Sequence, residues 1–361
     1  MISFYTEESH SDETSWLKYL IHPIRAYWGD GTKEWSKWKD NFSFYKDYFK
    51  IVRNIKDCDV GFLPLTLNYY VKEKKIGLVN KMANLMKKND QLLYIWVDGD
   101  HSINYSHPNC IILKYFGNSV MKTNNEIIRA GDMKKDLLNE HYHGVIKIRN
   151  KSDIPVVGFD GIANYQSIKL ISTVLKNSFE NFSYKFSRKI VKPDPIIPAL
   201  VKRKKLLNRL KRSYKIETNF KIRNSFAIGT VGRNNQARKD FIKNIISSDY
   251  TFCYRGAANY SLRFYETLCL GRIPLFINTN CILPFNEEID WENIVLWIDE
   301  NEKNYMIEKI YDYHHSMTNN QFIEKQYYCR EIWSKYLSKK GFIKNIHDKI
   351  KNSASLNFNP K

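Results

Sequence analysis

Short apolar runs alternate with longer amphipathic stretches along the whole chain. In the first half the apolar runs lie at 2–5, 60–65, 92–97, 110–113, 144–148 and 155–159. Segments 74–88 and 168–177 instead carry apolar residues at helical spacing. Buried parallel strands read as continuous apolar runs, and the connections between them are helices. The order therefore predicts an α/β fold with parallel sheets.

The second half repeats this alternation after a basic stretch marked by prolines. Residues 202–212 hold seven Lys or Arg in eleven positions, with Leu206, Leu207 and Leu210 spaced for an amphipathic helix. Apolar runs follow at 226–231, 250–254, 273–277 and near 295, and helical patterns at 237–246, 261–270 and 305–351. At 361 residues two domains are expected. We assign an N-terminal Rossmann-like domain to 1–187, a basic linker to 188–220, a second Rossmann-like domain to 221–325 and C-terminal helices to 326–361.

Composition excludes several classes of protein. The chain is 43% apolar and 14% aromatic, which is typical of packed cores and excludes disorder. No run of about 18 apolar residues is present, so we expect no membrane-spanning helix. The first residues, MISFYTEESHSDE, lack the basic and apolar pattern of a secretion signal. The six cysteines are scattered, with no C-x-x-C pair, which favours a reducing cytoplasm over a disulfide or zinc framework.

The chain carries a large excess of positive charge. It has 57 Lys and Arg against 38 Asp and Glu, a net charge of +19. Such a field attracts nucleic acid, anionic lipid headgroups and sugar nucleotides alike. Charge alone leaves two interpretations open, a lysine-rich solvated surface and a specific contact with an anionic membrane.

The most specific chemistry lies between residues 251 and 300. A short apolar strand ends in Arg255 and Gly256, a small polar turn follows, and one compact helix carries Arg263 and Glu266. This order gathers the unpaired N–H groups of a helix, its dipole and two arginines around one point, as an anion site requires. Arginine offers a planar fork that suits phosphate oxygens, and glycine allows close approach of the backbone.

This segment resembles the C-terminal signature of the exostosin family of glycosyltransferases. In that family a strand-R-G-turn precedes S-x-R-x-x-E-x-L-x-x-G-x-I-P, and L-P-F and I-D-W stretches follow. The matching positions here are Ser261, Arg263, Glu266, Leu268, Gly271, Ile273 and Pro274, then 283–285 and 289–291. The resemblance implies a GT-B fold, with two Rossmann-like domains facing a cleft. It also implies inverting transfer of a sugar from a nucleotide-sugar donor, UDP-linked, to a glycan or glycolipid acceptor.

The resemblance also implies roles for individual residues. The expected donor-binding residues are Arg255, Gly256, Ser261, Arg263 and Glu266, with Gly232, Arg233 and Arg238 from a weaker G-x-x-G-R motif at 229–233. Glu266 is expected to accept hydrogen bonds from the ribose. Asp290 of the I-D-W stretch is a weaker candidate. An isolated R-x-x-E is more often an ion pair within one helix, so this alternative stays beside the functional one.

The base that activates the acceptor is expected in the first half. The strand at 92–97 ends in Asp98, Gly99, Asp100 and His101, where the family has an H-D stretch. An inverting displacement needs one carboxylate or imidazole near the acceptor hydroxyl. Our candidates, in order, are Asp100, His101 and Asp98, with Asp160 in reserve. The structural alternative is that these acids cap the following loop.

Other functions remain open at this stage. Asp98-Gly99-Asp100 has the D-x-D pattern with which a GT-A glycosyltransferase holds Mn²⁺ or Mg²⁺. The long ordered C-terminal signature favours GT-B without a metal cofactor, and His141-x-His143 lacks the further ligands of a metal site. A non-catalytic binder of nucleic acid or another anionic polymer would use the charge and the 24 tyrosines. A glycan-binding descendant without turnover is a third possibility.

The resemblance finally implies partners and a location. Exostosin-type enzymes of animals and plants carry a membrane anchor and work in the Golgi. Since this sequence shows no such anchor, we expect a cytoplasmic enzyme whose basic stretch rests on the inner face of a membrane. Its partners would be a nucleotide sugar and a glycan or lipid-linked glycan. No specific nucleic acid is expected, because the key arginines lie within an apolar strand-helix unit.

Overall fold

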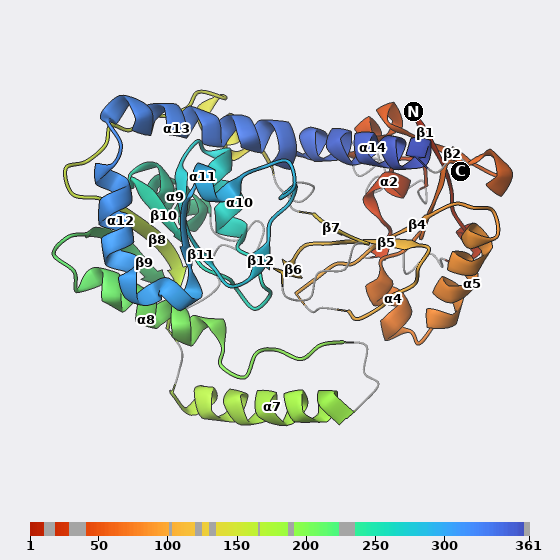
Figure 1. Cartoon of the computed structure of the whole chain (residues 1–361), viewed down its shortest axis with the longest axis horizontal. Coiled ribbons are helices and arrows are strands. Elements are labelled where there is room, and N and C mark those ends of the chain that lie inside the picture. Colours follow the sequence, from red (N-terminus) through yellow and green to blue (C-terminus); the bar gives the residue numbers. More distant parts are fainter. Residues whose placement is uncertain are drawn as a thin grey trace. The chain divides into compact units, whose positions relative to one another are not determined.

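Two parallel sheets form the framework of the chain in the computed structural model (Figure 1). The structure describes residues 1–10, 19–28, 41–100, 103–119, 125–129, 135–164, 167–186, 191–223 and 235–356. Each sheet belongs to its own unit. The first unit comprises residues 1–115, 121–132 and 339–361, and the second comprises 116–120 and 133–338.

The first sheet has the strand order β2-β1-β3-β4-β5-β7, with every pair parallel. Its strands are β1 (Ile2–Tyr5), β2 (Phe49–Val52), β3 (Val60–Phe62), β4 (Leu93–Trp96), β5 (Cys110–Lys114) and β7 (Glu126–Ile128). The helices of this unit are α2 (His22–Arg25), α4 (Leu67–Lys72), α5 (Ile76–Lys87) and α14 (Lys339–Leu356). Short 3-10 turns lie at Glu8–His10, Ser43–Asp47 and Ile55–Asp57. Aromatic side chains fill the core, where the rings of Phe4 and Phe62 stack at 4.6 Å.

The second sheet has the order β13-β11-β10-β8-β9, again all parallel. Its strands are β8 (Val156–Ile162), β9 (Glu217–Arg223), β10 (Tyr250–Cys253), β11 (Ile273–Asn278) and β13 (Leu296–Asp299). A small antiparallel pair joins β6 (Gly117–Asn118) to β12 (Cys281–Ile282). The helices are α6 (Leu137–Tyr142), α7 (Ser167–Phe186), α8 (Ala199–Lys211), α9 (Asn235–Ile246), α10 (Leu262–Cys269), α11 (Trp291–Ile294), α12 (Met306–His315) and α13 (Asn319–Ile332). A 3-10 turn precedes α12 at Glu300–Tyr305, and a π-helix follows α13 at Trp333–Leu337.

The connections of the second sheet reverse direction between β8 and β10. The chain leaves β8 through α7 and α8 to reach its neighbour β9, returns through α9 to β10 on the other side of β8, and continues outward through α10 to β11. The crevice at the carboxyl ends of two such strands is where open α/β sheets bind their ligands. The first sheet has the same kind of reversal between β1 and β3. Topology thus marks one candidate crevice in each unit.

The expected α/β GT-B architecture with a helical C-terminus is confirmed, but the chain divides differently from our assignment. Our assignment puts residues 156–162 in the N-terminal domain, whereas β8 pairs with β9 and β10 of the second sheet. It makes 188–220 a linker, yet the described part of this stretch contributes α8 and most of β9 to the second unit. An apolar run has no feature that tells which sheet it will join, so the boundary could not be set from the pattern.

Two further expectations differ from the structure or lie outside it. The expected strand at 144–148 is not formed, and these described residues are an irregular segment after α6. His143 ends that helix in the left-handed region with φ of 51°, so the H-x-H pair lies at a helix end and not on a strand. The expected strand at 226–231 and the turn at 229–233 lie outside the described residues.

Gly158→Ala should destabilise the second unit. A Cβ at this position of β8 would lie 2.2 Å from Ser248 Oγ and 3.0 Å from Asn244 Oδ1, so α9 and the following turn would have to shift. We expect a loss of about 1–3 kcal/mol in the free energy of unfolding, measured by urea denaturation. Gly77→Ala, in α5 with no atom within 4 Å, is the control and should not destabilise. Equal stabilities of the two variants would contradict this packing.

Candidate functional site

Arg263 lies at the carboxyl ends of β8 and β10, where the topology marks the candidate crevice of the second unit. As the second residue of α10 it reaches back to β8, where its Nη2 donates to the carbonyl of Asp160 at 2.8 Å. Its guanidinium lies over the ring of Phe159 at 4.3 Å. Burial lowers the pKa of Arg263 from its usual value. The Nε of Arg263 is buried without a hydrogen-bond partner in the part of the chain that the structure describes.

A second arginine, Arg203 of α8, joins the ends of the same two strands. Its Nη1 donates to the carbonyl of Ile162 at 2.9 Å, at the end of β8. Its Nη2 donates to the carbonyl of Arg255 at 2.6 Å and approaches that of Tyr254 at 3.4 Å, just past β10. Burial, together with the nearby charge of Arg263, lowers the pKa of Arg203 to about 10. Arg203 therefore holds positive charge at the point where the sheet topology reverses.

The sequence did not single out Arg203, because it is one of seven basic residues in a stretch interpreted as a linker. A signal was present nonetheless. Residue 203 stands three, four and seven positions before Leu206, Leu207 and Leu210, which places it on the apolar face of the helix. All three leucines are buried in the structure. An arginine at a buried position of an amphipathic helix needs buried partners, and here these are carbonyls.

Two ion pairs border this crevice. Arg223, at the end of β9, pairs with both carboxylate oxygens of the buried Asp160, with Nη2 and Oδ2 2.6 Å apart. Arg238 of α9 pairs with Glu266 of α10, with Nη2 and Oε1 3.0 Å apart. The carboxylate of Glu266 thus links two helices, so a pair within α10 does not account for it. Asp160, our reserve candidate for the base, is buried on β8, and its carboxylate is the counterion of Arg223.

The turn between β10 and α10 is closed by its own backbone. The amide of Gly256 donates to the carbonyl of Tyr260 at 3.1 Å, and Arg255 Nη2 donates to the carbonyl of Ala257 at 2.7 Å. Burial lowers the pKa of Arg255. Ser261 is the buried N-cap of α10, but its side chain makes no capping hydrogen bond. The first amides of the helix therefore lack the usual side-chain acceptor.

The charge balance of the crevice favours an anion. The carboxylates of Asp160 and Glu266 are each paired with an arginine from a neighbouring element. The guanidinium groups of Arg203, Arg255 and Arg263 instead donate to backbone carbonyls, and no ion pair joins them to a carboxylate among the described residues. Three cations without carboxylate partners near a free helix N-terminus form a site suited to a phosphate or carboxylate ligand.

In the first unit, the expected base candidates follow β4. Asp98 Oδ1 lies 3.4 Å from Nη1 of Arg129, which is only 1% exposed and also donates to the hydroxyl of Tyr115 at 2.8 Å. Asn68 Nδ2 donates to the carbonyl of Asp98, and the amide of Asp98 donates to Asn68 Oδ1, each at 2.8 Å. Asp100, two residues later, is exposed. The structure thus separates a tethered carboxylate, Asp98, from one at the surface.

Three of the expected site residues lie outside the described part of the chain, namely His101, Gly232 and Arg233. Asp290, the weaker candidate, is an exposed N-cap of α11 whose carboxylate accepts from Asn293, which gives it a structural role. Within the described residues, no group of three or more His, Cys, Asp or Glu side chains is arranged to hold a metal ion. A GT-A arrangement around Asp98-Gly99-Asp100 does not fit a chain built on two parallel-sheet units.

The topology also places two titratable residues, Glu7 and His10, near the candidate crevice of the first sheet. The crevice of the first sheet lies between β1 and β3, and Glu7 and His10 follow β1 directly. His10 Nδ1 lies 3.2 Å from the hydroxyl of Tyr70, and Glu7 accepts a hydrogen bond from Tyr5. Burial lowers the pKa of His10, which keeps its imidazole neutral at pH 7 and able to take up a proton.

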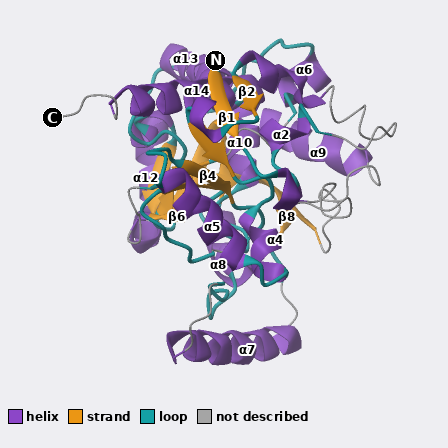
Figure 2. Ribbon diagram, turned by 90° about the vertical axis from the view of Figure 1, so that its right-hand side faces the viewer, coloured by secondary structure: helices purple, strands orange, loops and turns teal. Residues whose placement is uncertain are grey.

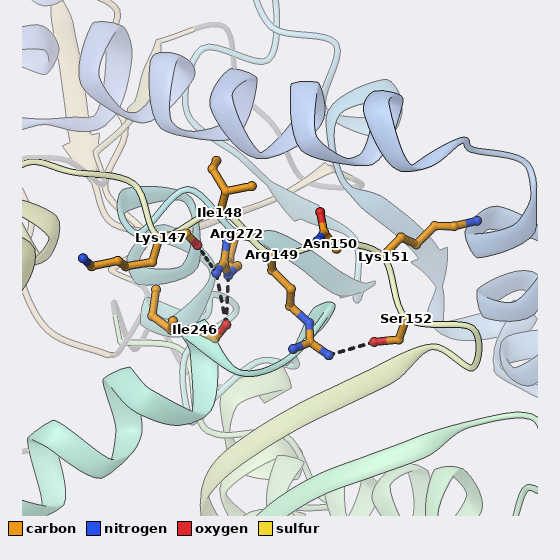
Figure 3. Close-up of a pocket in the computed structure, with 8 residues that line it drawn as sticks. All are labelled: Lys147, Ile148, Arg149, Asn150, Lys151, Ser152, Ile246 and Arg272. Carbon is orange, nitrogen blue, oxygen red and sulfur yellow. Dashed lines mark hydrogen bonds between the residues drawn. The ribbon is translucent and has the colours of Figure 1, made fainter.

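One surface depression, of about 350 Å³, lies elsewhere in the second unit (Figure 3). It is lined by Lys147, Ile148, Arg149, Asn150, Lys151, Ser152, Ile246 and Arg272. Arg272 directly precedes β11 and donates to the carbonyls of Lys147 and Ile246, which it ties together. The depression therefore lies at the amino ends of the strands, the edge opposite to ligand binding. Through these hydrogen bonds Arg272 holds the loop that contains Lys147 in place.

None of the helices in the described segments is long and apolar enough to cross a bilayer.

Comparison with known proteins assigns the region of the arginine cluster to a family. Residues 185–310 match the Exostosin GT47 domain. Exostosin-1 of Drosophila melanogaster is 30% identical over 88 residues, which are 24% of this chain and 11% of that protein. The Exostosin-1 homolog of Caenorhabditis elegans is 43% identical over 54 residues, 14% of each chain. The matches thus span a small part of these relatives' length.

The matched domain contains every arginine of the crevice together with Glu266, from Arg203 on α8 to Arg263 on α10. The signature that suggested the resemblance and the crevice that the topology marks are therefore the same place. Residues 185–310 of the chain therefore carry an Exostosin GT47 domain.

Proposed function

We propose that the protein transfers one sugar from a UDP-linked donor to a glycan or glycolipid acceptor, with inversion at the anomeric carbon. An Exostosin GT47 domain is a glycosyltransferase domain. The observation that carries the donor assignment is the set of three arginines, Arg203, Arg255 and Arg263, bound to carbonyls at the reversal between β8 and β10. Within the described residues no ion pair joins these guanidinium groups to a carboxylate, and their positive charge suits a diphosphate.

The chemistry explains why a site of this kind is needed. As the bond between sugar and phosphate breaks, the anomeric carbon becomes cation-like and negative charge grows on the leaving β-phosphate. Fixed guanidinium groups and helix amides stabilise that charge without reorganising, and burial strengthens the interaction. We assign this role to Arg263 and Arg203 from two helices, with Arg255 on the connecting turn.

We assign Glu266 to the ribose hydroxyls of the donor. Its ion pair with Arg238 holds the carboxylate in place, at 6% exposure. A carboxylate of this kind accepts hydrogen bonds from vicinal hydroxyls. Arg238 then acts as the residue that positions Glu266 and does not itself need to contact the donor.

The acceptor hydroxyl must lose its proton, and we propose Asp100 as the base. It is an exposed carboxylate in the segment that follows β4, two residues after Asp98. His10, at the reversal of the first sheet, is the alternative that the topology adds. We further propose that the enzyme acts in the cytoplasm and needs no divalent metal, so that transfer should persist in EDTA.

The donor assignment is tested with Gly256→Ala and a panel of sugar nucleotides. A Cβ at residue 256 would meet no atom within 4 Å, so the thermal midpoint of the ligand-free variant should equal that of the wild type. A methyl group on the turn should hinder a diphosphate, and we expect about tenfold weaker binding of the donor in calorimetry. Gly77→Ala serves as the control with wild-type affinity.

Failure of every sugar nucleotide to raise the thermal midpoint of the wild type would remove the proposed donor site. Unchanged affinity of Gly256→Ala for the donor would indicate that the diphosphate binds away from the turn between β10 and α10. A glycan-binding descendant without turnover is distinguished by a third result, in which UDP binds but no acceptor mixture yields free nucleotide.

A further inference from the structure

The helix α7 turns its apolar face outward. Ile171, Leu175, Phe179, Phe182 and Phe186 recur at helical spacing along one side, and their exposed fractions range from 64% to 79%. A surface helix of a globular protein normally buries such a stripe against the core. Five large apolar side chains exposed on a single helix face indicate that another medium covers them.

The polar side of α7 makes the contacts instead. Asn177, which is 5% exposed, donates from Nδ2 to the carbonyl of Pro195 at 2.8 Å. Asn181 Nδ2 donates to the carbonyl of Asp194 at 2.7 Å. The helix is thus fastened through its amide side chains to the segment that follows it. Both views draw α7 apart from the sheet of its own unit (Figures 1 and 2).

Basic residues border the apolar stripe. Between residues 167 and 192 the sequence holds six Lys or Arg, and Glu180 is the single acid. On an ideal helix Lys176 and Lys185 project about 100° and 80° from the centre of the stripe, on opposite sides. Both are exposed. Lysines placed in this way keep their charge in water while their stems cover apolar surface.

We propose that α7 binds in the plane of an anionic lipid bilayer, with the stripe inserted at the boundary of headgroups and acyl chains. An apolar face rich in phenylalanine and edged by lysines is the pattern of an interfacial helix. At 20 residues α7 is about 30 Å long, yet it is too polar to span a bilayer. Two copies packed through this face would bring their lysine borders together, whereas anionic headgroups neutralise them.

The membrane contact proposed for α7 replaces the one expected for the basic stretch at 202–212. Leu206, Leu207 and Leu210 of α8 are buried in the second unit, and Arg203 of α8 donates to the carbonyl of Ile162 at the end of β8. The helix that offers apolar surface to a bilayer is α7. The inference goes beyond the proposed sugar transfer and does not depend on it.

The test is flotation of the full chain with lipid vesicles. The wild type should float with vesicles of phosphatidylcholine containing about 30% phosphatidylserine and bind pure phosphatidylcholine more weakly. The double variant Phe179→Ser, Phe182→Ser should bind these vesicles at least about tenfold more weakly, since both exposed rings belong to the apolar stripe. The control Tyr327→Ser, Tyr328→Ser removes two exposed rings from α13 and should float like the wild type.

Charge reversal supplies a second measurement. Lys176→Glu, Lys185→Glu should weaken binding to phosphatidylserine vesicles several-fold and reduce its dependence on salt. Equal flotation of the phenylalanine variant and the wild type would overturn the proposal. So would light scattering that shows a wild-type dimer, a monomeric phenylalanine variant and no vesicle binding, because a second copy would then cover the stripe. Donor affinity, measured on the same variants, tests the proposed donor site independently of membrane binding.

Discussion

Arg263→Ala is expected to lower turnover by about a hundredfold or more, because it removes a fixed cation from the place where charge develops on the leaving phosphate. In the structure this guanidinium is anchored by Asp160 and Phe159, and its Nε is left without a partner among the described residues. The measurement is kcat at saturating donor and acceptor, read as release of free nucleotide.

Two companion variants separate chemistry from stability. Arg263→Lys keeps the charge but loses the planar fork, so its turnover should lie between those of the alanine variant and the wild type. Arg209→Ala, on α8 of the same unit, removes a guanidinium whose Nη1 binds Asn304 at the surface, and turnover should stay at the wild-type value. Full turnover in a folded Arg263→Ala protein would contradict the assigned role.

Asp100→Asn is expected to reduce transfer by about 10²- to 10⁴-fold while leaving donor affinity unchanged. The amide keeps the shape of the side chain but cannot accept the acceptor's proton. Because Asp100 is exposed, its loss should not alter the thermal midpoint. Transfer is measured with a saturating donor, and donor affinity by calorimetry on the same preparation.

Neighbouring substitutions show whether the effect belongs to Asp100. Asp98→Asn would remove the carboxylate that lies 3.4 Å from Nη1 of the buried Arg129, so it should lower the free energy of unfolding by about 1–3 kcal/mol. Any loss of transfer by Asp98→Asn should then be accounted for by its lower free energy of unfolding. Normal transfer by Asp100→Asn, together with loss of transfer in His10→Gln, would move the base from the end of β4 to the end of β1.

Much of the donor crevice was predictable because its chemistry is local in sequence. Residues 255 to 266 span one turn and one helix, and helical spacing alone places Arg263 and Glu266 on one side of α10. The apolar runs likewise predicted β1, β4, β10 and β11 to within about one residue at each end. The role of these residues in binding a donor stays a prediction.

The sequence by itself determined the class of fold, the turn between β10 and α10, and the family whose signature that turn resembles. Only the tertiary structure decided that β8 joins the second sheet, that Arg203 meets Arg263 where the topology reverses, that Asp160 is a counterion, and that α7 turns its apolar stripe outward. The physical reason is that a sequence pattern reports only on interactions between residues that are close together along the chain. Periodicity reports which face of one element is apolar, but it carries no information about which distant element will cover that face.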